Sequence, residues 1–111
     1  RFGFDERWLR HLTSAKSASL SIVGVKGDSM EPTLSDGDEV LVDASDHGSR
    51  LRDGIYVLRS DDALVVKRIA IKPGGRQITI ASDNPAYPTW YDMDRSEVHV
   101  VGRVIWFGRA L

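Results

Sequence analysis

The chain has 111 residues, of which 41% are hydrophobic and 28% charged, a composition typical of one soluble globular domain with its own core. Fifteen Lys and Arg against sixteen Asp and Glu leave a formal net charge of −1, which gives no electrostatic signature of a surface for nucleic acid or anionic membrane. The absence of cysteine excludes a disulfide framework, a thiolate nucleophile and a cysteine-ligated zinc site, and it fits a reducing, cytoplasmic compartment.

No apolar run approaches the roughly 20 residues that a membrane-spanning helix needs. No signal-peptide pattern precedes the domain either. We therefore expect no contact with a membrane. The chain begins with Arg1 rather than Met, so we expect it to be a piece of a longer protein.

Residues 1–19 are predicted to form one short helix followed by a linker. Phe4, Trp8 and Leu12 recur with the spacing of one helical face. Residues 13–19 are small and polar, as in a loop. We expect this segment to pack on a domain formed by residues 20–111, and the alternative is that all of it is linker.

From residue 20 onwards, short β-type runs alternate with Gly, Asp and Asn residues. Strands are predicted over residues 20–26, 39–43, 54–59, 64–71, 77–81 and 98–107. A hairpin turn is predicted at residues 60–62, and Gly102 indicates a bulge or a close backbone approach. Residues 82–88 are predicted to be irregular, since proline cannot donate to a strand ladder. The fold class is therefore mainly β, with one short N-terminal helix.

Ser29 lies between Gly27 and Pro32, directly after the first predicted strand, where the chain must turn. Such a turn can expose a side chain and direct backbone N–H groups toward one point, as an oxyanion hole requires. Most serines in turns are caps or surface residues, however. Ser29 alone therefore indicates no chemistry.

Lys67 is the more informative residue. In a strand it shares one face with Val65, Ile69 and Ile71. Partial desolvation among these apolar side chains lowers the pKa of a lysine. A neutral amine could then take the proton of Ser29, the Ser–Lys variant of nucleophilic catalysis. The alternative is that Lys67 snorkels to solvent at a sheet edge.

The remaining polar and aromatic residues are assigned structural roles. Arg68 is interpreted as a surface charge or an ion-pair partner. Three aspartates are assigned to turns and strand ends, namely Asp36, Asp38 and Asp43. The histidines lack the spacing of zinc ligands, so no metal and no cofactor is expected at His11, His47 and His99. Four aromatics are predicted to be core, with a contact surface as the alternative: Trp90, Tyr91, Trp106 and Phe107.

The stretches VKGDSMEPTLSDGDEVLVD, GIYVLR, LVVKRI, SDNPAYP and VVGRVIWFGR together resemble the S24 peptidase domain of LexA-like and phage cI-like repressors, which also occurs in UmuD. The resemblance runs from about Phe4 to Arg109. It implies a small β domain of the LexA and signal-peptidase type. The combination of GDSMEPTL with a downstream VKR is specific, and the N-terminal FDERWLR is more similar to the cI-type repressors.

The resemblance also implies a mechanism and partners. Ser29 would be the nucleophile, Lys67 its general base, and the backbone N–H groups of Asp28 and Ser29 the oxyanion hole. A helix-turn-helix domain, absent from this chain, would bind operator DNA. The β domain would form a homodimer through residues 98–107, and the RecA filament would stimulate self-cleavage.

The family typically cleaves an Ala–Gly or Cys–Gly bond, and this chain contains neither. The cleaved bond therefore lies before Arg1, or this protein cleaves elsewhere or not at all. Three alternatives stay open at this point. They are a dimerisation module displaced by an antirepressor, a UmuD-like polymerase accessory protein and a Ser–Lys signal peptidase.

Overall fold

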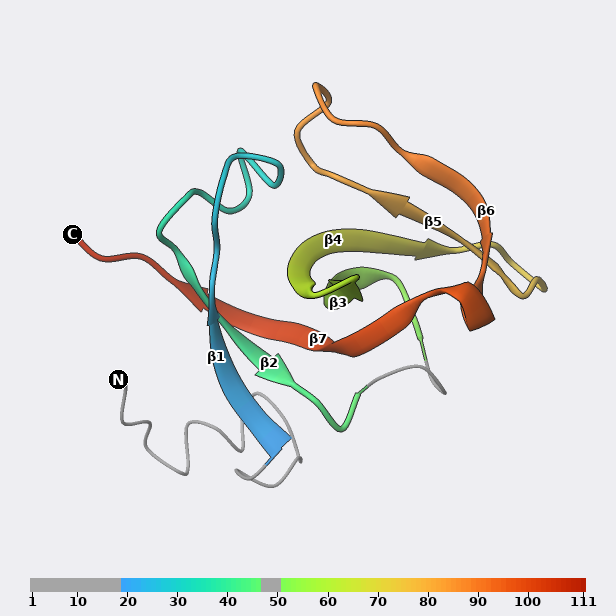
Figure 1. Ribbon diagram of the computed structural model, residues 1–111, viewed down its shortest axis with the longest axis horizontal. Coiled ribbons are helices and arrows are strands. Elements are labelled where there is room, and N and C mark those ends of the chain that lie inside the picture. The colour runs from blue at the N-terminus through green and yellow to red at the C-terminus, as the bar shows by residue number, and fades with distance from the viewer. Residues whose placement is uncertain (1–18, 47–50) are drawn as a thin grey trace.

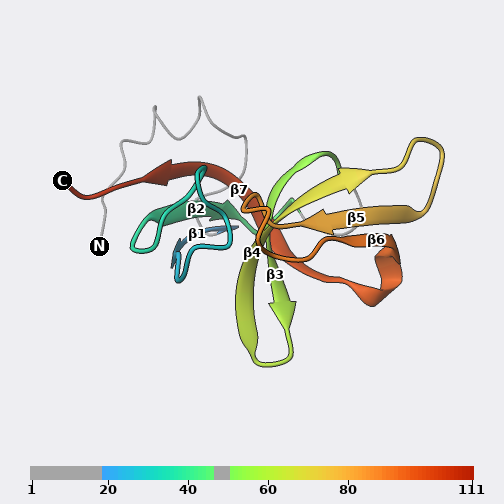
Figure 2. The same ribbon diagram turned by 90° about the horizontal axis from the view of Figure 1, so that it is seen from above.

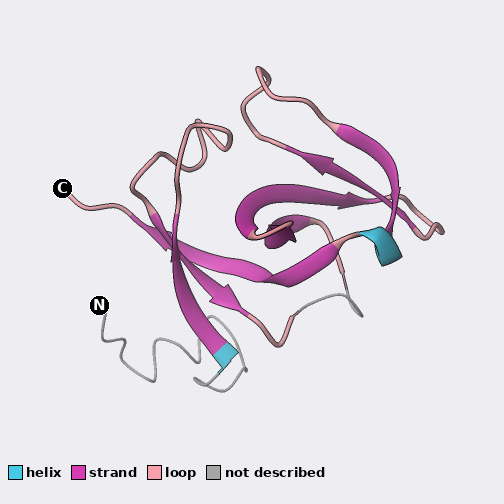
Figure 3. Ribbon diagram, in the orientation of Figure 1, coloured by secondary structure: helices cyan, strands magenta, loops and turns pink. Residues whose placement is uncertain are grey.

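The computed structural model of the protein describes residues 19–46 and 51–111 (Figure 1). These residues form one antiparallel sheet and contain no α-helix, so the predicted mainly β class is confirmed (Figure 3). The predicted N-terminal helix of Phe4, Trp8 and Leu12 lies outside the described residues. The strands are β1 (Leu20–Gly24), β2 (Glu39–Asp43), β3 (Gly54–Ser60), β4 (Ala63–Ile71), β5 (Gln77–Ala81), β6 (Trp90–Asp94) and β7 (His99–Gly108).

The sheet order is β1-β2-β7-β3-β4-β5-β6, so the last strand of the chain lies near the middle of the sheet. Strand β7 pairs with β2 on one side and with β3 on the other. The strands curl strongly around this junction, with β1 and β2 on one side and β5 and β6 on the other (Figures 1 and 2).

Two features differ from the predictions. Strand β6 was not among the predicted strands, although its residues pair with β5. A short 3-10 turn, Arg95–Glu97, then leads into β7. Aromatic side chains of β6 and β7 were predicted to be core, but Trp90, Tyr91 and Phe107 are 47%, 72% and 45% exposed. For these three residues the contact-surface alternative describes the structure better.

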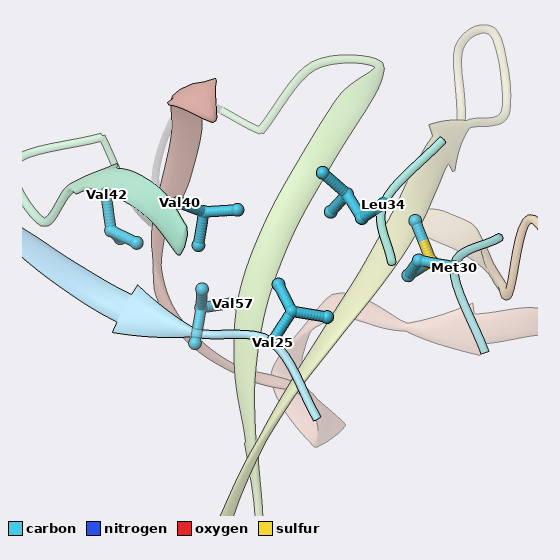
Figure 4. Close-up of a cluster of buried hydrophobic side chains, with 6 residues drawn as sticks. All are labelled: Val25, Met30, Leu34, Val40, Val42 and Val57. Atoms are coloured by element: carbon cyan, nitrogen blue, oxygen red, sulfur yellow. The ribbon is translucent and has the colours of Figure 1, made fainter. Parts of the chain in front are cut away.

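The curled sheet has two hydrophobic clusters because its central strands are covered on both faces. The first cluster includes Val25, Met30, Leu34, Val40, Val42 and Val57 (Figure 4). The second includes Leu51, Tyr56, Leu58, Ile69, Ile78 and Ile80. Strand β3 contributes to both, since alternate side chains of a strand point to opposite faces. Strand β4 does so too, with Val66 on the first cluster and Val65 on the second.

Gly102 combines both features expected of it. The pairing of β3 with β7 shifts register at Val57, which marks a bulge. A Cβ atom at Gly102 would lie 2.7 Å from both the Asp43 carbonyl oxygen and the Val42 Cγ1 atom. Only glycine therefore allows β7 to approach β2 this closely at this point.

Candidate active site

The turn that carries Ser29 spans residues 27–34 between β1 and β2. It begins at Gly27, whose φ of +81° favours glycine and whose N–H donates to Asp36 Oδ1 over 2.6 Å. Met30 and Leu34 are both 1% exposed and point into the first hydrophobic cluster (Figure 4). Ser29 therefore lies on a short segment that is anchored immediately after it, with its own side chain half-buried.

Lys67 is buried in the middle of β4, where it is 9% exposed and pairs with Tyr56 of β3. Desolvation lowers the pKa of its ammonium below the ordinary value of 10.5. The rings of Tyr87 and Trp90 lie 5.8 Å and 5.9 Å from Nζ, measured to their centroids. Lys67 does not snorkel to solvent, and desolvation makes its ammonium easier to deprotonate than that of an exposed lysine.

Ser29 and Lys67, far apart in sequence, line the same cavity. This cavity has a volume of 390 Å³ and lies between the Ser29 turn, the end of β1 and the first half of β4. The backbone N–H groups of Asp28 and Ser29, the other two predicted site groups, belong to the same turn. Within the described ranges neither N–H donates to a protein acceptor. Ser29 and Lys67 therefore face a common cavity, and the two N–H groups belong to the turn that forms part of its wall.

The hydrogen bond of Lys67 goes to a residue that the sequence analysis did not single out. Nζ donates to Ser82 Oγ over 2.7 Å, and both side chains are 9% exposed. Among the described residues, no hydrogen bond joins Nζ to Ser29. No local sequence pattern marks Ser82, because it lies beside Lys67 only through the pairing of β4 with β5, in which Ala81 is opposite Arg68.

The loop that follows Ser82 also holds the Ser29 turn. The Asn84 backbone N–H donates to the Ser29 carbonyl and its side-chain amide to the Asp28 carbonyl, each over 3.0 Å. The Tyr87 hydroxyl donates to the Asp28 carboxylate, which raises the pKa of Tyr87. The loop of residues 82–88 and the Ser29 turn lie at the same end of the molecule (Figure 1). One loop therefore contacts both Lys67 and the segment that carries Ser29.

Asp83 joins three segments of the site. Its carboxylate accepts two hydrogen bonds from the Arg68 guanidinium, at 2.7 Å and 2.8 Å, and one from the Thr33 hydroxyl at 2.5 Å. The Arg68 hydrogen bonds lower the pKa of Asp83. Arg68 is therefore an ion-pair partner, one of the two roles expected for it. The carboxylate of Asp83, which follows Ser82 in the sequence, is therefore bound by Arg68 and Thr33 rather than by Lys67.

The three aspartates assigned to turns and strand ends occupy such positions. Asp36 accepts from Gly27, as described above, and Asp43 accepts from the Ser45 N–H and hydroxyl. Asp38, 1% exposed, accepts from the Ser35 N–H and two hydrogen bonds from Arg109. The described part of the chain holds no group of three potential metal ligands. It also holds no helix long and apolar enough to cross a membrane.

Comparison with known proteins gives matches over most of the chain. The model of the family described as Peptidase S24-like matches residues 2–105. The 26 kDa repressor protein of Escherichia phage HK022 is 35% identical over 89 residues, which is 78% of this chain and 37% of that protein. The Repressor protein CI of Enterobacteria phage phi80 is 38% identical over 82 residues, or 73% of this chain and 33% of that protein. The chain spans about a third of the length of these relatives.

Proposed function

Because the chain belongs to the Peptidase S24-like family, we propose that it is the self-cleavage and dimerisation domain of a phage or prophage transcriptional repressor. One observation carries the proposal. Ser29 and a desolvated Lys67 line the same cavity, as a nucleophile and its base must. The two phage relatives are repressors by name, which favours this function over a polymerase accessory protein or a signal peptidase.

In the first chemical step, neutral Lys67 removes the proton of the Ser29 hydroxyl while Oγ attacks the carbonyl carbon of the cleaved peptide bond. Transfer requires Nζ and Oγ to approach to about 2.6–3.2 Å. Nζ therefore has to share or exchange its hydrogen bond with Ser82 when substrate enters. The negative charge that forms on the carbonyl oxygen is accepted by the backbone N–H groups of Asp28 and Ser29.

In the second step, the C–N bond breaks and Lys67 returns its proton to the departing amine. This leaves an ester between Ser29 and the N-terminal fragment. Lys67 then removes a proton from a water molecule, which attacks the ester carbonyl and releases Ser29 as a free hydroxyl. One lysine thus serves both halves of the reaction, and neither half requires a metal or an organic cofactor.

The partners belong to the same proposal. A helix-turn-helix domain outside this chain would bind operator DNA, in keeping with the net charge of −1 found here. The RecA filament would stimulate cleavage after DNA damage. Homodimers would form through the end of β7, where Phe107 is exposed. Cleavage would then separate the dimerisation domain from the DNA-binding domain and release the operator.

The test is self-cleavage of the full-length protein, followed by gel electrophoresis and mass spectrometry with and without activated RecA. We expect two fragments whose masses identify the cleaved bond, and none in Ser29→Ala or Lys67→Ala. Ser21→Ala, which changes an exposed serine on β1, serves as the matched control and should cleave normally. Cleavage that persists in Ser29→Ala contradicts the proposal.

A second candidate function is a dimerisation module that an antirepressor protein displaces from DNA. It is favoured by the exposed aromatics Trp90 and Tyr91, which could contact a partner. The cleavage experiment separates the two functions. Intact protein after incubation with activated RecA at alkaline pH supports the antirepressor alternative.

A further inference from the structure

The side chain that contacts the Lys67 amine is Ser82, at the end of β5. Nζ and Oγ are 2.7 Å apart, and both residues are 9% exposed, so little water competes for this hydrogen bond. The position is set by the sheet, since the pairing of Arg68 with Ala81 brings the end of β5 beside the middle of β4. Strand pairing therefore positions Ser82, which directly follows the last residue of β5.

The charged groups around Lys67 are held by other partners or lie further away. Asp83 is bound by Arg68 and Thr33, and the Asp28 carboxylate is bound by the Tyr87 hydroxyl. A second cavity, which Lys67 also lines, includes Arg59, Glu97 and His99, while the first includes Lys26. Within the described ranges, no carboxylate lies within 4.0 Å of Nζ. The direct polar partner of Lys67 is thus a neutral hydroxyl.

A hydroxyl suits a lysine that must change its protonation state. It accepts a hydrogen bond from an ammonium group and can rotate to donate one to a neutral amine. A carboxylate in the same place would stabilise only the ammonium form and raise the pKa of the lysine. An alanine would leave the long lysine side chain free to adopt other rotamers.

We propose that Ser82 is a positioning residue that holds Lys67 Nζ in the cavity in both protonation states, so that it can serve as the base for Ser29. The inference rests on the proposed function. The same loop also reaches the nucleophile, since Asn84 binds the carbonyl groups of Asp28 and Ser29. The loop of residues 82–88 therefore sets the relative position of the base and the nucleophile.

The first test is the pH dependence of self-cleavage in three variants of the full-length protein. Ser82→Ala should lower the maximal rate by about a hundredfold, the scale of a small misplacement of a catalytic group. Ser82→Thr, which keeps the hydroxyl, should recover part of that loss. Ser82→Asp should move the rise in rate to higher pH, because the carboxylate stabilises the ammonium form. The exposed Ser21→Ala variant is the control.

The second test measures the pKa of Lys67 directly by NMR titration of its labelled side chain, in a Ser29→Ala background that cannot cleave. Ser82→Asp should raise this pKa by at least one unit relative to Ser29→Ala alone. A wild-type rate and pH profile in Ser82→Ala, or an unchanged Lys67 pKa in Ser82→Asp, overturns the inference. If the wild-type protein does not cleave, the proposed function fails, whereas the NMR result still decides whether Ser82 controls Lys67.

Discussion

Two buried charged side chains, Asp38 and Lys67, are surrounded in opposite ways. Asp38 accepts two hydrogen bonds from Arg109 and one from the Ser35 N–H, which hold its pKa at about 2. Among the residues that the structure describes, the Lys67 amine contacts the Ser82 hydroxyl and lies near two aromatic rings, and desolvation lowers its pKa. The first arrangement stabilises the charged form and the fold. The second disfavours the charged form, which is what a general base requires.

Asp38 should therefore control part of the acid stability. Its pKa in the folded state, about 2, lies below the ordinary value of 3.8, so its contribution is fully present above pH 3.8 and is lost as the pH falls toward 2. In Asp38→Asn, the free energy of unfolding should be lower at pH 6 and fall less steeply between pH 4 and pH 2. Urea unfolding at several pH values measures this. Parallel curves for the two proteins would contradict the assignment.

For single residues, the sequence predicted which side chains could carry chemistry better than it predicted which side chains lie next to them. Val65 and Ile69 on the same strand face as Lys67 indicated a desolvated lysine, and the structure places it in such a site. Ser82 was overlooked because its role depends on the pairing of β4 with β5, which periodicity does not reveal. The exposure of Trp90 and Tyr91 was also missed, since a large apolar side chain gives no local sign of which face it occupies.

At the scale of elements, the turn of residues 27–34 is held by its own apolar side chains. Met30 and Leu34 insert into the first cluster beside Val25, Val40 and Val57 (Figure 4). The Leu34 N–H also donates to the Met30 carbonyl over 2.9 Å. The position of Ser29 therefore depends on core packing as well as on the contacts of Asn84.

Leu34→Ala should destabilise the protein by about 2–5 kcal/mol, the usual cost of truncating a buried leucine. Leu34 is 1% exposed, whereas Leu64 of β4 is 45% exposed, so Leu64→Ala is the matched control and should change stability by about 0.5 kcal/mol or less. Denaturant unfolding of both variants gives the comparison. Equal losses in the two variants would show that Leu34 does not anchor the turn.

Most strands could be predicted because they combine β-branched residues with turn residues on either side. Strand β2 was predicted with its observed bounds, and β5 likewise. Strand β6 was not, because it follows a proline-containing loop and includes Asp92 and Asp94, which are uncommon in strands. Its pairing with β5 is a tertiary effect. The order of the strands, with β7 in the middle, was equally invisible to local patterns.

At the scale of the whole molecule, the curled sheet leaves exposed aromatic side chains at its two sides. Phe107 lies near the end of β7, with the Arg109 guanidinium 5.9 Å from its ring centroid. Tyr91 lies on the edge strand β6. We place the proposed dimer contact at Phe107, because it belongs to the segment that the family resemblance implies. Strand β7 pairs with β3 over residues 99–103 and with β2 over residues 103–108, and Phe107 is the exposed large apolar side chain near its end.

This placement predicts a dimer at concentrations of tens of micromolar. Phe107→Glu should convert it to a monomer, because a buried charge without a partner is costly at an interface. Tyr91→Glu, at a more exposed aromatic, should leave the dimer intact. Sedimentation velocity measures all three proteins. A monomeric wild-type chain would contradict dimerisation, and a dimeric Phe107→Glu variant would contradict its location.

The pairing of Ser29 with Lys67 as nucleophile and base is tested most directly by the pH–rate profile of self-cleavage in the full-length protein. The rate should rise tenfold per pH unit and level off at an apparent pKa below 10.5, because only neutral Lys67 can accept the proton. Lys67→Arg keeps the positive charge but not the titration, and it should be inactive at every pH. A rate independent of pH, or cleavage by Lys67→Arg at the wild-type rate, would contradict the account.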